Sequence, residues 1–177
     1  MGRLFAQDTE GCLQDTILLK KMTIMENLLT AELPEELDIM PEYLKNTFYP
    51  CEDRPEMILS DADGSVQMTF QMLHRELKTG ETWDAADALS RCVERLYPKN
   101  EISPVCLYSH GETPTGCFFM DMELGDVYVR HVKAVRAVQG QFFLITMTYP
   151  REESGKWQAV LKHLFSTLRE KDRSRIQ

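Results

Sequence analysis

The sequence lacks any hydrophobic run long enough to cross a membrane. Its longest uninterrupted apolar stretches are only a few residues long, as in the FFLI of residues 142–145, whereas a spanning helix needs about 20 apolar residues. The first residues also lack a charged segment followed by an apolar one, so no secretory signal is visible. We therefore expect a soluble, cytoplasmic protein that does not insert into a membrane.

Cysteine and histidine spacing is unlike that of a disulfide framework or a metal site. The five cysteines are odd in number, and no two of them stand in C-x-x-C spacing. The four histidines, His74, His110, His131 and His163, form none of the motifs H-x-H, H-x-x-x-H or H-E-x-x-H. The sequence also has no phosphate-cradling G-x-x-x-x-G-K-[ST] and no G-x-G-x-x-G. We therefore expect reduced cysteines, no metal and no cofactor.

Positive charge is scarce relative to negative charge. The formal net charge is -8, with 28 acidic and 20 basic residues. Such a balance repels nucleic-acid phosphates and anionic lipid surfaces, so we expect neither as a partner. A length of 177 residues with 43% hydrophobic residues suits one folded domain. We predict a loosely ordered lead-in over residues 1–14, a single domain over residues 15–170 and a charged tail over residues 171–177.

Residues 128–150 carry the strongest structural signal. They read YVRHVKAVRAVQGQFFLITMTYP, in which two runs rich in β-branched and aromatic residues flank Gln139 and Gly140. This pattern predicts an antiparallel hairpin with a two-residue turn, where Gly140 supplies the positive φ that such turns require. Val138 is then expected opposite Gln141, and this pairing sets the register of the whole hairpin.

The remaining segments predict an antiparallel sheet covered by helices. Strands are expected over residues 17–25, 28–33, 57–60, 65–73, 105–108 and 116–122, and helices over residues 34–48, 82–97 and 152–169. Each of the last two helices has an apolar stripe: Trp83, Ala86, Leu89, Val93 and Leu96 in one, and Trp157, Val160, Leu161, Leu164 and Leu168 in the other. The order β-β-α-β-β-α-β-β-β-β-α favours an α+β fold, an α/β/α sandwich whose antiparallel sheet lies between helices.

Three pieces of the sequence resemble a known family. They read AELPEEL, YPCEDRPEMILSDADGSVQMTF and HVKAVRAVQGQFFLITMTYPREESGKWQAVLKHLFSTL. Their order is similar to that of the PsbP-like fold, which is shared by the photosystem protein PsbP, the Ran-binding Mog protein and the bacterial DcrB-like proteins. The resemblance covers residues 17–168 and is greatest to small bacterial members. It implies a binding or accessory role and supplies no catalytic residue.

The predicted hairpin register places four polar side chains on one face. His131, Lys133, Thr146 and Thr148 lie there, farther from the turn than an apolar patch on the same face. Donors and acceptors beside apolar surface are typical of a binding site for a small ligand or a peptide. Lys133 favours an anionic or carbonyl-bearing ligand. The alternative interpretation is the solvated end of a sheet that a helix only half covers.

These observations leave two functional hypotheses. The first is a non-enzymatic binding or accessory protein that engages a protein segment, a peptide or a small ligand on a sheet face. The second is a small hydrolase-like enzyme with His110 or His131 as general base. His110 stands in the segment Ser109-His110-Gly111-Glu112-Thr113. We favour a polar loop there, because a catalytic triad draws its members from separate elements.

Overall fold

The hairpin that the sequence marks most strongly lies at the centre of the larger of two sheets. The computed structural model describes residues 17–111 and 113–172. Strand β8 (Val127–Val138) turns at Gln139 and Gly140 into β9 (Gln141–Pro150). Both turn residues have positive φ, at 50° and 71°, as a primed two-residue turn requires. Val138 lies opposite Gln141, so the predicted register is confirmed.

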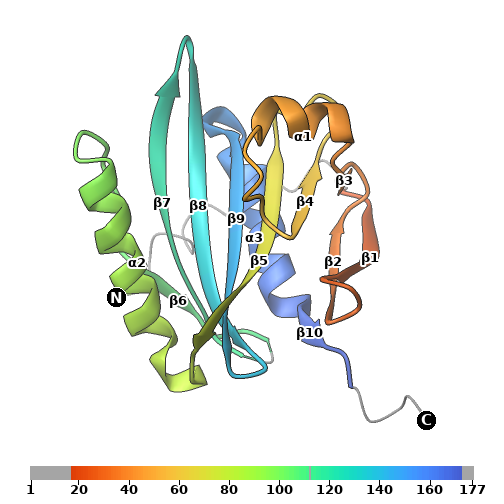
Figure 1. Cartoon of the computed structure of the whole chain (residues 1–177), viewed down its shortest axis with the longest axis vertical. Helices are drawn as coiled ribbons and strands as arrows, with labels where there is room; N and C mark the ends of the chain where they lie inside the picture. Colours follow the sequence, from red (N-terminus) through yellow and green to blue (C-terminus); the bar gives the residue numbers. More distant parts are fainter. Residues whose placement is uncertain (1–16, 112, 173–177) are drawn as a thin grey trace.

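The larger sheet has seven antiparallel strands in the order β3-β4-β5-β9-β8-β7-β6. Its other members are β3 (Asp38–Ile39), β4 (Met57–Ser60), β5 (Gln67–Glu76), β6 (Cys106–Tyr108) and β7 (Thr115–Leu124). The pairing of β5 with β9 brings together strands that are far apart in the chain. An antiparallel sheet with helices on its two faces confirms the predicted α+β fold (Figure 1).

The first hairpin forms a sheet of its own rather than extending the larger one. Strand β1 (Leu19–Ile24) pairs with β2 (Leu29–Pro34), and β2 pairs in turn with β10 (Arg169–Glu170). Leu33 and Ile24 are fully buried in the same apolar cluster as Met68 and Ile145 of the larger sheet. The hairpin therefore covers one face of the larger sheet, because face-to-face packing buries its apolar side chains and edge pairing would not.

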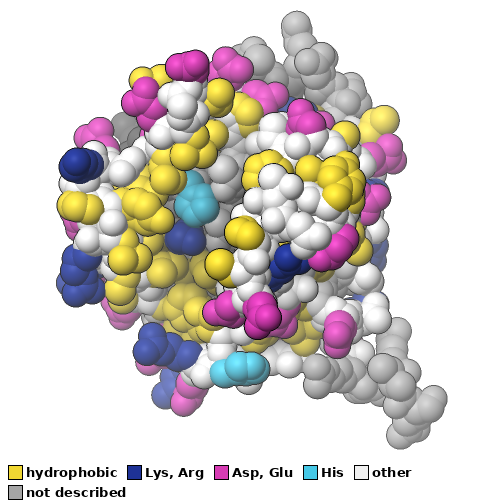
Figure 2. Space-filling model, turned by 45° about the horizontal axis from the view of Figure 1, so that its top comes forward, with side chains coloured by type: hydrophobic (Ala, Val, Ile, Leu, Met, Phe, Trp, Pro, Cys, Tyr) yellow, Lys and Arg dark blue, Asp and Glu magenta, His cyan; other side chains and the backbone are white. Residues whose placement is uncertain are grey.

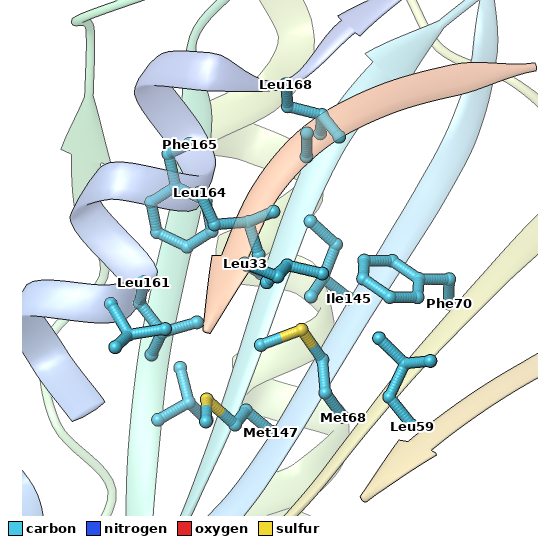
Figure 3. Packing of buried hydrophobic residues seen from close by; sticks show 14 of the residues in the cluster. Leu33, Leu59, Met68, Phe70, Ile145, Met147, Leu161, Leu164, Phe165 and Leu168 are labelled. Atoms are coloured by element: carbon cyan, nitrogen blue, oxygen red, sulfur yellow. The ribbon is translucent and has the colours of Figure 1, made fainter. Parts of the chain in front are cut away.

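Two longer helices cover opposite faces of the larger sheet (Figure 1). Helix α3 (Ser154–Thr167) follows the short turn η2 (Arg151–Glu153) and packs beside the first hairpin, and all five residues of its predicted stripe are buried. Figure 3 shows Leu161 and Leu164 of this helix among side chains of β2, β5 and β9. Within residues 17–111 and 113–172, no helix is long and apolar enough to span a bilayer.

Helix α2 (Thr82–Leu96), which follows the turn η1 (Thr79–Glu81), confirms its predicted stripe only in part. Ala86 and Val93 are buried against β7 and β8. Trp83 is 45% exposed and Leu96 is 74% exposed, so these two members of the stripe are not part of the core. The helix contacts β7 and β8 through a narrower stripe than the one predicted, in which Thr82, Ala86 and Val93 are buried.

The predicted helix over residues 34–48 is too long. Helix α1 (Glu42–Phe48) begins only after Pro41, and Pro34 is the last residue of β2. Between them Leu37 and Met40 are buried at 0% and 1% exposure, and β3 pairs with β4. Burial of those two side chains and the strand pairing outweigh the local preference for helix that the acidic residues after Pro34 suggested.

A buried arginine joins β8 to the end of α3. The Arg136 side chain is 2% exposed. Its guanidinium donates hydrogen bonds to the carbonyl oxygens of Phe165 and Leu168, at 2.8 and 3.3 Å, and to the hydroxyl of Thr115 at 3.0 Å. Carbonyls at the end of a helix have no partner within the helix. Arg136 therefore fixes the last turn of α3 against the sheet.

Candidate functional site

The four predicted site residues lie together on one face of β8 and β9. His131 stands opposite Thr148, and Lys133 stands opposite Thr146. The His131 Nδ1 atom lies 2.7 Å from the Thr148 hydroxyl, and the Lys133 ammonium donates to the Thr146 hydroxyl at 3.5 Å. The geometric part of the prediction is therefore confirmed, since the register places these side chains as expected.

The polar surface continues across two more strands. Gln67 of β5 stands opposite Thr148, Thr69 stands opposite Thr146, and Ser60 of β4 stands opposite Gln67. Directly paired residues of antiparallel strands share a face. We call this surface the polar band, and it consists of Ser60, Gln67, Thr69, His131, Lys133, Thr146 and Thr148. It crosses four strands in the middle of the larger sheet.

One end of the polar band is held by the chain that follows α1. The Tyr49 hydroxyl donates to Gln67 Oε1 at 2.8 Å. The Gln67 amide nitrogen donates to the carbonyl of Gly64 at 2.9 Å. These two bonds fix which way the Gln67 amide points. Ser60 is 3% exposed, and its hydroxyl finds no partner among the described residues.

Helix α2 covers the same face along two more borders of the band. Toward the hairpin turn, Val135 and Phe142 are buried with Ala86 of α2. Toward β7, Phe118 and Met120 are buried with Val93. The side chains of His131, Lys133, Thr146 and Thr148 themselves stay half-buried. In Figure 2 a histidine and an adjacent basic side chain lie in a hollow bordered by hydrophobic side chains.

Burial sets the protonation of the band. Loss of water contact lowers the pKa of His131 to about 4, and the positive charge of Lys133 adds to this effect. Burial also lowers the pKa of Lys133. Among the described residues, no carboxylate oxygen lies within 4.0 Å of the Lys133 ammonium. At neutral pH the band thus offers a neutral imidazole, hydroxyls, an amide and one ammonium.

The other histidines lie outside the band. His110 is exposed, and its ring centroid lies 5.3 Å from that of Tyr108. Glu112, which the hydrolase hypothesis placed beside it, lies outside the described residues. His163 contacts Glu32 at 2.6 Å, and His74 is exposed. Residues 17–111 and 113–172 contain no group of three or more His, Cys, Asp or Glu side chains arranged to hold a metal ion.

Sequence reasoning missed the part of the band on β4 and β5. The alternation of Gln67, Thr69 and Gln71 with apolar residues did indicate a strand with one polar face. What the sequence did not indicate is that this strand lies beside β9, in a register that aligns Gln67 with Thr148. That pairing joins distant parts of the chain, and no local turn specifies it.

Comparison with known proteins identifies the fold. No family model matches the chain, and no curated protein matches it significantly. The solved structure of cyanobacterial PsbP from Synechocystis is similar at 7% identity, with a TM-score of 0.59 over 90% of this chain and 96% of that one. The Ran-binding protein Mog1p of Saccharomyces cerevisiae is similar at 10% identity, with a TM-score of 0.59 over 90% and 98%.

A third structure agrees with these two. LpqN of Mycobacterium tuberculosis, described as involved in cell envelope biogenesis, matches at 9% identity with a TM-score of 0.53, over 87% of this chain and 91% of that one. Likeness at such low identity reports the path of the backbone and not the chemistry of a site. The resemblance noted in the sequence is thereby confirmed at the level of the fold, and the chain has the PsbP-like fold.

Proposed function

We propose that this protein is a non-enzymatic binding or accessory module that holds its ligand on the polar band. One observation carries the proposal: polar side chains from four neighbouring strands gather in the middle of a sheet whose adjoining surface is apolar and covered by α2. A sheet face solvated by chance needs only polar side chains that point into water. Here His131 and Lys133 are instead half-buried and bonded to threonines.

The fold of the similar structures supports a binding role without specifying a ligand. Mog1p is Ran-binding by its description. A protein segment, a peptide or a small molecule would each find hydrogen-bonding groups on the band. The proposal includes a cytoplasmic location and excludes nucleic acid and membranes as partners. The net charge of -8 supports the second part, because it repels phosphates and anionic lipids.

The hydrolase alternative has one observation in its favour. Thr148 places a hydroxyl 2.7 Å from an imidazole nitrogen of His131, within the reach that nucleophile and base need. A pKa of about 4 makes that imidazole a weak base at neutral pH. Among the described residues, no carboxylate hydrogen-bonds to His131 to orient it as a triad acid would. The arrangement of these side chains therefore fits a binding site better than the active site of a hydrolase.

A ligand screen followed by residue-level mapping tests the proposal. Isotope-labelled protein is mixed with short peptides and small organic molecules, and amide chemical-shift changes are assigned to residues. We expect shifts on β5, β8 and β9 around His131, and their loss in the His131→Ala variant. A Thr146→Val/Thr148→Val double variant should weaken binding too, because it removes two hydroxyls and keeps the side-chain shape. Thr23→Val, at an exposed position of β1, is the matched control. Shifts that map to another surface, or that persist in both band variants, would assign the function elsewhere.

A further inference from the structure

We propose that the ligand of the polar band carries a carboxylate group that pairs with Lys133, next to an apolar group that lies toward the tip of the β7–β8 hairpin. This inference rests on the proposed function and names the class of ligand. Its first support is that no carboxylate of residues 17–111 and 113–172 forms a salt bridge with the Lys133 ammonium. The chain has 28 acidic residues, and Lys20, Lys45 and Lys156 each lie within 4.0 Å of a carboxylate.

Lys133 differs from those three lysines in position and in pairing. It lies half-buried in the middle of the sheet, and the hydrogen bond that it donates within the described residues goes to the neutral hydroxyl of Thr146. Removing an ammonium from water is unfavourable unless it gains charged or hydrogen-bonding partners. A partner would therefore stabilise the complex more here than at the surface, where ion pairs contribute little. A bound anion supplies that partner.

The groups around Lys133 suit a carboxylate in particular. The Thr146 hydroxyl lies next to the ammonium, and His131 stands two residues along the same strand face. In the tautomer whose Nδ1 accepts a hydrogen bond from Thr148, the Nε2–H of His131 is a second donor. An ammonium, a hydroxyl and an imidazole N–H together can satisfy both oxygens of one carboxylate.

The charge of the band favours a single negative charge over a phosphate. Lys133 is the one positive group of the band as defined. Arg130, the next basic residue of β8, alternates to the opposite face and forms a two-bond pair with Asp121. Phosphate sites draw on arginine forks, clustered cations or backbone amides. One ammonium on a protein with a net charge of -8 matches the single charge of a carboxylate better than the higher charge of a phosphate.

The apolar part follows from the strand alternation beyond His131. Val129 and Val127 continue the same face of β8, and Met122 and Leu124 stand opposite them on β7. Leu124 and Val127 are 55% and 53% exposed. The distance along the strand from Lys133 to Val127 is roughly 20 Å, at about 3.3 Å per residue. This surface fits the apolar last residues of a peptide with a free C-terminus, or the chain of an aliphatic acid.

Paired probes that differ only in charge test the inference. Dodecanoate is compared with dodecanamide, and a short apolar peptide with a free C-terminus is compared with its amidated form. We expect at least one acid to bind the band about tenfold more tightly than its amide, with shifts at the Lys133 side chain and at Thr146. Which acid does so distinguishes a small-molecule ligand from a peptide.

Variants of two lysines provide the control. Lys133→Met should abolish the preference for the acid, and Lys133→Gln should do the same if the methionine variant folds poorly. Lys21→Met, at an exposed position of β1, should keep the preference. Equal binding of acid and amide at the band would overturn the carboxylate inference and leave the proposed function standing. Chemical-shift changes at the band with other compounds of the screen, but with none of the acids, would also overturn the carboxylate inference and leave the proposed function standing. A complete absence of shifts at the band would overturn both.

Discussion

At the residue scale, His131 shows how a position in the middle of a sheet changes the chemistry of a side chain. Burial lowers its pKa to about 4 in the folded protein, whereas histidine in an unfolded chain titrates near 6.5. Between these two values the unfolded state binds more protons than the folded state. The contribution of His131 to stability is therefore complete above about pH 6.5 and is lost as the pH falls toward 4.

This linkage predicts a pH dependence of unfolding. Between pH 7 and pH 5 the wild-type protein should lose on the order of 2 kcal/mol more stability than the His131→Gln variant, because glutamine does not titrate. Urea unfolding followed by circular dichroism at the two pH values measures this difference. His74→Gln, at an exposed site, should behave like the wild type. Identical pH dependence in wild type and His131→Gln would mean that the imidazole is not held neutral by burial.

At the scale of elements, α3 depends on its apolar stripe for its place in the fold. Leu161 is 1% exposed and lies in the cluster that joins α3 to both sheets. We expect Leu161→Ala to lower the free energy of unfolding by roughly 2–5 kcal/mol, because it removes buried methyl groups and leaves a cavity. Leu96→Ala on α2 is the control, since Leu96 is 74% exposed. Thermal melts of the two variants should separate clearly, and a Leu161→Ala midpoint equal to that of the control would contradict the placement of α3.

Helix α2 lies close to β7 because Gly116 of β7 has no side chain. A Cβ at Gly116 would lie 2.8 Å from the Cβ of Ala86 and 3.1 Å from the carbonyl of Thr82. Gly116→Ala should therefore push α2 outward and reduce stability by about 1–3 kcal/mol, the usual effect of overpacking. Gly80→Ala has no atom within 4 Å of the added Cβ and serves as the control. Chemical denaturation distinguishes the two. If the Gly116 variant were as stable as the Gly80 variant, the close approach of α2 to β7 would be wrong.

At the scale of the whole molecule, the two sheets and α3 share one core. Ile24 and Leu33 of the smaller sheet, Phe143 of the larger one and Trp157 of α3 belong to a single cluster. Elements that pack into one core expose their buried side chains together when the protein unfolds. We therefore expect one cooperative unfolding transition. In a Trp83→Phe variant, fluorescence reports Trp157 alone, since the chain has two tryptophans. Its denaturation curve should coincide with the far-ultraviolet circular dichroism curve. Two separated midpoints would show that the core around Trp157 of α3 does not unfold together with the rest of the protein.

Much of the fold could be predicted because its signals are local. Gln139 and Gly140 specify a turn, and the turn fixes the partners of His131 and Lys133 within a few residues on either side. The stripe of α3 likewise repeats over a few turns of one helix. The local preference for helix after Pro34 was misleading. Asp38 instead pairs with the distant strand β4, and Met40 is buried in the core.

The sequence by itself determined the central hairpin, its register, the inward face of α3 and the placing of His131, Lys133, Thr146 and Thr148 on one surface. Only the tertiary structure decided that the first hairpin forms a second sheet, that Trp83 stays exposed and that Gln67 and Ser60 extend the polar surface. The physical reason is the separation of the partners along the chain. A turn fixes which neighbouring residues pair, whereas pairing of β5 with β9 depends on how all the apolar surfaces are buried at once.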